Sequence, residues 1–170
     1  MTDANDVAQY NMAFMLPSVK QFLLSFEIIL SRTFKSFYYK NIDANSQEYS
    51  DVDAVAGSLF MMNVPKMLQY GMFDENVFLY CEEIILGIKF KYNGLKIALL
   101  NTERYVHNHS VSISKSYCSN FKRNKLLNRS KLYVLKEYYN AGPITLFLAK
   151  ILSLINLVES TAIDVLKGRN

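Results

Sequence analysis

One block between Gly57 and Ser114 constrains this chain more than any other part of its sequence. The block reads GSLF from residue 57, FDENVFLYCEE from residue 73 and HNHSVS from residue 107. An aromatic run leads into two adjacent carboxylates at the start of a predicted helix, and two imidazoles follow one strand later. The adjacent carboxylates could supply a general base, and the imidazoles could bind a metal ion or a phosphate.

Size and composition indicate a globular chain. Its 170 residues suffice for one domain with a sizeable core. The hydrophobic share of 51% and the charged share of 20% are typical of folded rather than disordered proteins. The two cysteines form neither a disulfide framework nor a metal-ligand spacing, which favours a reducing compartment, most simply the cytoplasm.

Basic side chains are concentrated in one segment, although the net charge is only +4. Between Lys115 and Lys136 the chain carries basic residues and no acidic ones. Such a run is either a solvated helix face or a surface that attracts anionic lipid headgroups or a pyrophosphate-bearing substrate. No nucleic-acid motif surrounds it and its aromatic residues are sparse, so nucleic acid is not expected as a partner.

The sequence also bears on membrane association. The first nine residues are polar and acidic and lack the basic segment of a signal peptide. Nowhere do about 18 apolar residues follow one another without interruption, as in a typical spanning helix. We therefore expect a soluble or peripheral protein, in the cytoplasm or at the inner face of the plasma membrane.

Periodicity and turn residues predict a mixed order of helices and strands. Helices are expected over 18–39, with a break near Ser31, over 65–70, over 80–92 and over 122–139. Strands are expected over 52–62, with Gly57 inside, and over 96–100 and 104–107. Polar or turn-rich loops are expected over 41–50 and 72–78, and Asn93-Gly94 and Gly142-Pro143 are expected to end helices.

The last segment, 144–167, predicts a long helix with one polar stripe. Polar residues recur in it every three to four positions, and leucine, isoleucine, valine and phenylalanine fill most of the rest. A wide apolar face on a terminal helix either packs on the domain or a partner, or lies in a membrane interface. The pattern leaves both uses open.

Glu82 and Glu83 stand at the predicted start of a helix. Carboxylates there are stabilised by the helix dipole and the free N–H groups, so their role is either charge complementarity or catalysis. Moving a sugar onto a hydroxyl requires the acceptor O–H to lose its proton as the new bond forms. A positioned carboxylate that takes this proton typically contributes ~10² to 10⁴-fold in rate.

His107 and His109 are the only histidines of the chain. On a strand, residues two apart share one face, so the two imidazoles could bind a divalent cation or a phosphate oxygen. The serines that follow them are equally consistent with a polar loop.

Taken together, these elements resemble the C-terminal, acceptor-side half of family 2 glycosyltransferases, particularly the rhamnosyltransferase-like members that build bacterial surface polysaccharides. The matching order is a strand with glycine, Gly-x-Phe-Asp-Glu, Phe-Leu-Tyr-x-Glu-Glu, a helix, Asn-Gly, a strand, and histidine followed by serine. The resemblance covers roughly residues 50–115. It implies part of an α/β domain of the GT-A type, which as a fragment would be α+β, with few strands and flanking helices.

The resemblance also implies roles for individual residues. Glu83 falls on the family's catalytic base, where many relatives have aspartate, and Glu82 is its neighbour. His107, together with His109, falls on the side of the donor diphosphate or its metal. The remaining implied residues border the sugar and acceptor site: Gly57, Phe73, Asp74, Glu75 and Tyr80.

The nucleotide-binding half of such an enzyme, with its Asp-x-Asp metal motif, is not recognisable in the sequence. Asp51-Val-Asp53 is the only Asp-x-Asp, and its position before Gly57 argues against a metal role. The resemblance implies Mg²⁺ or Mn²⁺ in the complete enzyme, and no metal need bind to this chain alone. We expect the chain to be inactive by itself and to need a separate nucleotide-binding half or a second copy.

The expected organisation is a partial GT-A-like domain over 1–120 and a helical extension over 121–170, basic and then amphipathic. The expected reaction is inverting transfer of a sugar from a nucleotide sugar to a hydroxyl of a glycan or lipid-linked acceptor. The alternative is a non-catalytic module that binds a partner or an anionic membrane surface. A small hydrolase is disfavoured because the sequence contains no Gly-x-Ser-x-Gly elbow.

Overall fold

The computed structural model describes residues 13–33, 48–103, 105–106 and 119–168. These residues form two compact units that interleave along the chain. The strand unit contains the described residues of 13–16, 48–75 and 82–106, and the helical unit contains those of 17–33, 76–81 and 119–168. This division differs from the linear boundary at residue 120 that the sequence suggested, because an N-terminal segment belongs with the C-terminal helices.

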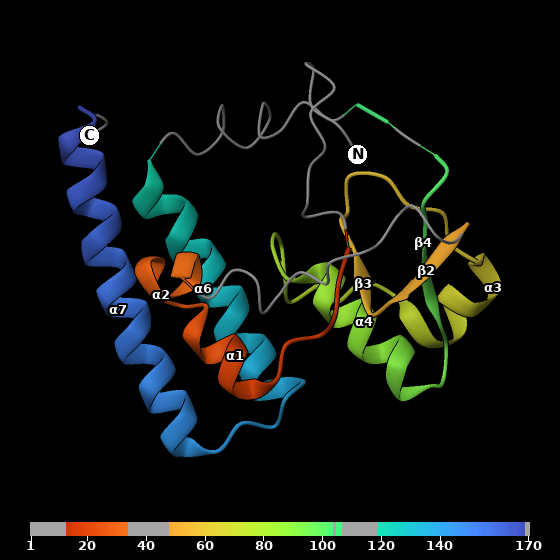
Figure 1. The fold of residues 1–170 in the computed structure, drawn as a ribbon. Helices are drawn as coiled ribbons and strands as arrows, with labels where there is room; N and C mark the ends of the chain where they lie inside the picture. The colour runs from red at the N-terminus through yellow and green to blue at the C-terminus, as the bar shows by residue number, and fades with distance from the viewer. Residues whose placement is uncertain (1–12, 34–47, 104, 107–118, 169–170) are drawn as a thin grey trace. The chain divides into compact units, whose positions relative to one another are not determined.

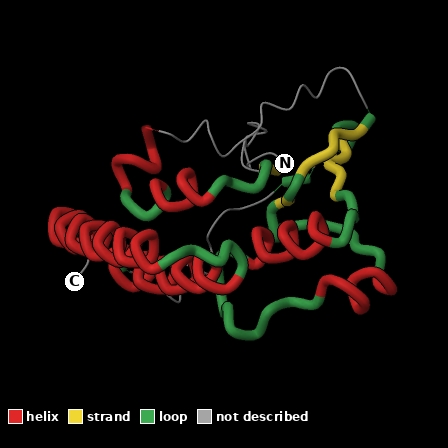
Figure 2. The backbone as a smooth tube through the Cα atoms, turned by 90° about the horizontal axis from the view of Figure 1, so that it is seen from below, coloured by secondary structure: helices red, strands yellow, loops and turns green. Residues whose placement is uncertain are grey.

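The strand unit holds two small antiparallel sheets (Figures 1 and 2). β1 (Ala13–Phe14) pairs with β3 (Ala54–Val55), and β2 (Tyr49–Val52) pairs with β4 (Ile97–Leu100). In the second sheet Tyr49 lies opposite Leu100 and Val52 opposite Ile97. Together with the helices of the chain, these sheets make the fold α+β.

Three helical segments complete the strand unit: α3 (Val64–Lys66), the π-helical turn η2 (Met67–Gly71) and α4 (Glu82–Tyr92). Asn63 caps α3 through its side chain, which accepts a hydrogen bond from the N–H of Lys66. α4 ends where Gly94 adopts a positive φ of 66°, and its end at Asn93-Gly94 is therefore confirmed. Ile85 and Leu86 of α4 are buried and belong to the core of this unit.

The prediction of one strand over 52–62 is wrong. β3 ends at Val55, and Gly57 and Ser58 lie in an exposed turn. The backbone N–H of Gly57 donates to the side chain of Glu83 and so is not part of a strand ladder. The strand at 96–100 is confirmed as β4, whereas residues 104 and 107 of the strand expected over 104–107 lie outside the described residues.

The helical unit consists of α1 (Val19–Leu24), α2 (Ile28–Thr33), α6 (Asn120–Glu137) and α7 (Pro143–Leu166). The break in the first predicted helix falls at 25–27, not near Ser31. Ser25 causes it locally, because its hydroxyl donates to the Phe22 carbonyl at 2.6 Å and ends α1. The aromatic core of this unit includes Phe22, Phe26 and the ring of Tyr139.

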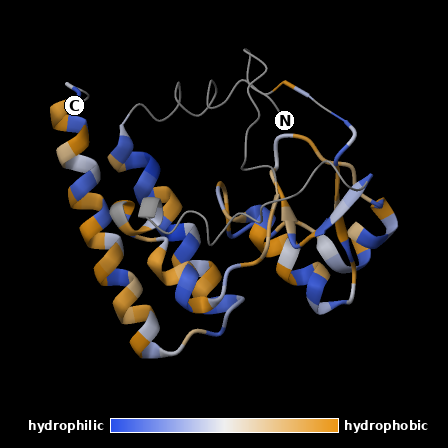
Figure 3. Cartoon of the chain, viewed as in Figure 1, coloured by the Kyte–Doolittle hydropathy of each residue, from blue (hydrophilic) through white to orange (hydrophobic). Residues whose placement is uncertain are grey.

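α6 and α7 lie side by side and run antiparallel (Figures 1 and 2). Of the predicted polar stripe of α7, Ser153, Asn156, Ser160 and Asp164 are buried, together with Ala149. Lys150 and Lys167, at the two ends of the stripe, are exposed. The apolar face is exposed, and Figure 3 shows how apolar most of this helix is. α7 is thus turned with its polar side inward and its apolar side outward.

Candidate functional site

The candidate site begins with the first turn of α4, which places two carboxylates at a helix N-terminus. Glu82 and Glu83 are the first two residues of this helix. The preceding residues Tyr80 and Cys81 both have φ of 69°, in the left-handed region that non-glycine residues rarely adopt. Strained backbone of this kind costs roughly 1–3 kcal/mol per residue and is concentrated at functional sites in proteins.

Glu83 is held in a defined orientation by Gly57. Its Oε1 atom accepts a hydrogen bond from the backbone N–H of Gly57 at 2.9 Å. A Cβ atom added at residue 57 would lie only 2.7 Å from that oxygen, which explains why a glycine suits this position. The structure therefore brings together two residues that the sequence singled out, 26 positions apart.

Glu83 lies on the wall of a cavity of about 570 Å³ within the strand unit. This volume is in the range of small-molecule sites, roughly 300–1,000 Å³. The polar side chains of the lining include Glu83, Lys66, Glu103 and Tyr105, and much of the remainder is apolar, such as Leu59, Phe60, Met61, Met62 and Leu99. Tyr105 also shares a hydrogen bond with the hydroxyl of Ser58 in the turn beside Gly57. A ligand in this cavity would meet an apolar wall and a few polar groups.

Glu82 differs from its neighbour. It is half-buried, and its Oε2 atom is buried with no hydrogen-bond partner among the described residues. Burial raises the pKa of the Glu82 carboxyl, and the negative charge of Glu83 raises it further, while a hydrogen bond from the backbone lowers it in part. Two adjacent carboxylates therefore have different environments, as is common where one of them handles a proton.

The structure does not bring the other predicted residues into the cavity wall. Phe73 and Glu75 are exposed in the loop after η2, and Asp74 is half-buried there. None of these three lines the cavity. Tyr80 belongs to the helical unit, and His107 and His109 lie outside the described residues.

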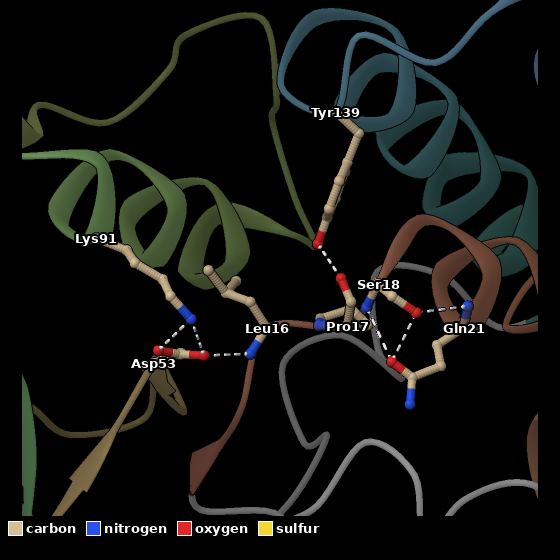
Figure 4. A network of polar contacts seen from close by, with 7 residues as sticks. All are labelled: Leu16, Pro17, Ser18, Gln21, Asp53, Lys91 and Tyr139. Carbon is tan, nitrogen blue, oxygen red and sulfur yellow. Dashed lines mark hydrogen bonds and ion pairs between the residues drawn. The ribbon is translucent and has the colours of Figure 1, made fainter.

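The described residues do not supply a metal site. Among them, no group of three or more histidine, cysteine, aspartate or glutamate side chains is placed to hold an ion. Asp53 instead forms an ion pair with Lys91 at 2.9 Å and accepts a hydrogen bond from the N–H of Leu16 (Figure 4). Asp51 pairs with Lys96 at 3.1 Å. Both carboxylates of the Asp-x-Asp sequence therefore have structural contacts within the strand unit.

Sequence reasoning did not identify the other polar residues of the cavity. Lys66 comes from α3, whereas Glu103 and Tyr105 come from the segment after β4, and no spacing links these two segments to Glu83. They share a wall only because the chain folds back on itself. Comparisons of the chain with protein-family models, with curated proteins and with solved structures gave no match.

Proposed function

We propose that the strand unit is the acceptor-binding part of an inverting glycosyltransferase of the GT-A type, with Glu83 as its general base. The observation that carries the proposal is the position of the Glu83 carboxylate, which lies on the cavity wall and is oriented by the N–H of Gly57. The resemblance of the surrounding sequence to family 2 glycosyltransferases supports the same assignment. The donor would be a nucleotide sugar, and the acceptor a glycan or a lipid-linked glycan of surface polysaccharide synthesis.

In the proposed reaction the acceptor hydroxyl lies in the cavity beside Glu83. Its oxygen attacks the anomeric carbon of the donor sugar, the bond from that carbon to the diphosphate breaks, and the nucleoside diphosphate leaves. The Glu83 carboxylate takes the hydroxyl proton as the new bond forms. The hydrogen bond from Gly57 holds the carboxylate in one orientation, which a general base requires.

Glu82 has a supporting role in this proposal. Its raised pKa keeps a proton available near Glu83 at a higher pH than for an ordinary glutamate. Phe73, Asp74 and Glu75 would approach the acceptor from a loop of the strand unit outside the cavity wall. The acceptor role of Tyr80 comes from the resemblance alone. His107 and His109 would act on the side of the donor diphosphate, where the complete enzyme would hold Mg²⁺ or Mn²⁺.

The nucleotide-sugar donor is proposed to bind to a separate nucleotide-binding half of the enzyme, not to the helices and strands described here. The described strands form two antiparallel pairs and include no parallel sheet of the kind that binds nucleotides. We therefore expect acceptor binding by this chain alone, and sugar transfer only together with a nucleotide-binding partner.

Methionine methyl groups provide the test. Met61, Met62 and Met67 line the cavity, whereas Met72 does not. The full chain, labelled with ¹³C at the methionine methyls, would be titrated with short glycans and glycolipids and followed by NMR. We expect the three cavity signals to shift and the Met72 signal to stay in place.

A Glu83→Gln variant separates a base from a structural residue. Glutamine keeps an oxygen for the Gly57 N–H, so binding of the acceptor should persist while transfer in the reconstituted enzyme falls by about 10²-fold or more. The matched control is Glu48→Gln, on an exposed carboxylate of the same unit outside the cavity. Unchanged transfer by Glu83→Gln would refute the role of Glu83, and cavity methyls that respond to no glycan would refute the acceptor site.

A further inference from the structure

The interface between the N-terminal half of α6 and the C-terminal half of α7 is polar. Side chains one helical turn apart on α6 bond to side chains one turn apart on α7, and the pairs are Asn120 with Asp164, Asn124 with Ser160, and Asn128 with Asn156. The N–H groups of Asn120 and Phe121 also donate to Asp164, which thereby caps α6 from the neighbouring helix. These contacts fix which side of α7 is turned inward.

The opposite side of α7 is apolar and exposed. Ile144, Ile151 and Val158 are seven residues apart and mark the centre line of this face, and Leu154 and Ile155 flank it. Leu154 is 64% exposed and Val158 is 70% exposed. At 3.6 residues per turn, the exposed apolar positions span an arc of roughly 120°. In water such a face is unfavourable, and it requires an apolar environment.

α7 meets the size requirement for contact with a bilayer. Among the described helices it alone is long and apolar enough to cross a membrane by length and composition. Its 24 residues correspond to about 36 Å, slightly more than the hydrocarbon core of a bilayer.

α6 argues against a spanning orientation. It runs beside α7 from Asn120 to the loop before Pro143, so a spanning α7 would take α6 into the hydrocarbon. α6 exposes Lys122, Lys125, Arg129 and Lys136. Each basic residue at the centre of a bilayer costs at least about 2.5–3.5 kcal/mol. The two helices therefore fit a bilayer only if α7 lies in the plane of the interface with α6 on its water side.

Width and charge favour a lipid surface over a second copy of the chain. The seam of a two-stranded coiled coil covers two positions per heptad, and the flanking positions usually carry charges. In α7 the heptad position beside the seam is instead apolar, with Leu148 and Ile155. A single partner helix would cover the seam and leave much of the apolar face of α7 exposed. α6 carries six basic residues and one acidic residue, which attracts anionic headgroups.

We propose that the helical unit docks on an anionic membrane surface, with the apolar face of α7 immersed in the interface and its polar face held by α6. This arrangement is monotopic, and it is independent of the glycosyl-transfer chemistry proposed for the strand unit. The lipid acyl chains would cover the apolar face, and the basic side chains of α6 would add a salt-dependent attraction.

Binding is tested by sedimentation of the full chain with phosphatidylcholine vesicles that contain or lack phosphatidylglycerol. We expect binding that is stronger with the anionic lipid and that weakens at high salt. Leu154→Gln with Val158→Gln should weaken binding at least about tenfold, because two immersed apolar side chains are lost. The matched control is Leu68→Gln with Val64→Gln, two apolar residues with 65% and 57% exposure outside α7. Circular dichroism checks that all variants keep their helices.

Orientation is tested with single tryptophans, since the chain has none of its own. Ile144→Trp, Val158→Trp and Val165→Trp place a probe along the exposed face of α7. Quenching by brominated lipids should report the same shallow depth for all three positions. A depth that changes steadily from residue 144 to residue 165 would indicate a spanning helix and overturn the proposal.

Two further outcomes would also overturn it. If Leu154→Gln with Val158→Gln binds vesicles as the unmodified chain does, the apolar face is not immersed. The second outcome is that the chain binds no vesicles and forms a dimer, which the same substitutions dissociate in analytical ultracentrifugation. The apolar face of α7 would then be covered by a second copy of the chain.

Discussion

The Oε1 atom of Glu83 lies 2.9 Å from the backbone nitrogen of Gly57 and accepts its hydrogen bond. This contact joins the first turn of α4 to the turn after β3 and orients a carboxylate on the wall of the cavity. The absence of a Cβ at residue 57 makes the contact sterically feasible.

Gly57→Ala should impair the site without unfolding the protein. The new Cβ would lie 2.7 Å from Glu83 Oε1, and the flexible glutamate would turn away at a cost below about 1 kcal/mol in the free energy of unfolding. We expect acceptor binding, measured by the methionine NMR titration, to weaken about tenfold because the carboxylate loses its orientation. Gly142→Ala is the control, since no atom lies within 4 Å of a Cβ there. Equal binding by both variants would contradict the prediction.

Gly87→Ala should destabilise the protein, although the same change inside an exposed helix usually stabilises by about 1 kcal/mol. A Cβ at residue 87 would lie 2.5 Å from the backbone oxygen of Asp53 and 3.3 Å from a methyl group of Leu16. Backbone cannot move aside cheaply, so we expect a loss of about 1–3 kcal/mol in urea unfolding. A stabilised Gly87→Ala variant would show that α4 is not packed against β3 in this way.

The buried pair Asn128 and Asn156 should be energetically coupled. The amide of Asn128 donates to Oδ1 of Asn156 at 3.0 Å, and both side chains are buried. Changing either one to alanine leaves a buried polar group without its partner, so each change should cost about 1–3 kcal/mol. The double variant should cost less than the sum by about 1 kcal/mol.

A double-mutant cycle in urea measures this coupling. The control cycle pairs Asn128→Ala with Lys66→Ala, which lies in the strand unit and should be additive. Additivity between Asn128 and Asn156 would mean that their hydrogen bond does not hold α6 against α7.

Lys131 should make stability depend on pH. Its Nζ donates to the Ser25 carbonyl at 2.6 Å and lies 5.4 Å from the ring centre of Phe26. Burial lowers the pKa of Lys131 to about 8, from an ordinary value of 10.5. Between these values the unfolded chain binds a proton that the folded chain has released. The free energy of unfolding should therefore rise with pH across this window, by about 1–3 kcal/mol.

The comparison chain for this prediction is Lys131→Met. It lacks the amine, so its stability should rise less between pH 8 and pH 10.5 than that of the unmodified chain. Chemical unfolding at several pH values gives the two slopes. Identical slopes would show that Lys131 keeps its ordinary pKa in the folded protein.

Local signals in the sequence predicted the helices well. α4, α6 and α7 were expected within a few residues, because apolar periodicity, Asn93-Gly94 and Gly142-Pro143 act over a single turn of chain. The strand over 52–62 failed for the opposite reason. The partner of the Gly57 N–H is a side chain 26 residues away, which no local pattern reveals.

The candidate site shows the same limit. Gly57 and Glu83 could be selected from the sequence because their motifs resemble those of a known family. Lys66, Glu103 and Tyr105 could not, because they meet only when separate segments enclose the cavity. Phe73, Asp74 and Glu75 were selected by the same motifs, yet they do not line it.

For α7, the sequence alone determined a long helix with one polar and one apolar side. Which side faces inward was decided by the tertiary structure, because Asp164, Ser160 and Asn156 find hydrogen-bond partners on α6. Burying these polar groups costs little once they are paired, whereas a helix wheel does not show where the partners lie. The apolar side therefore faces outward, for the physical reason that the polar side is the one with a complementary neighbour.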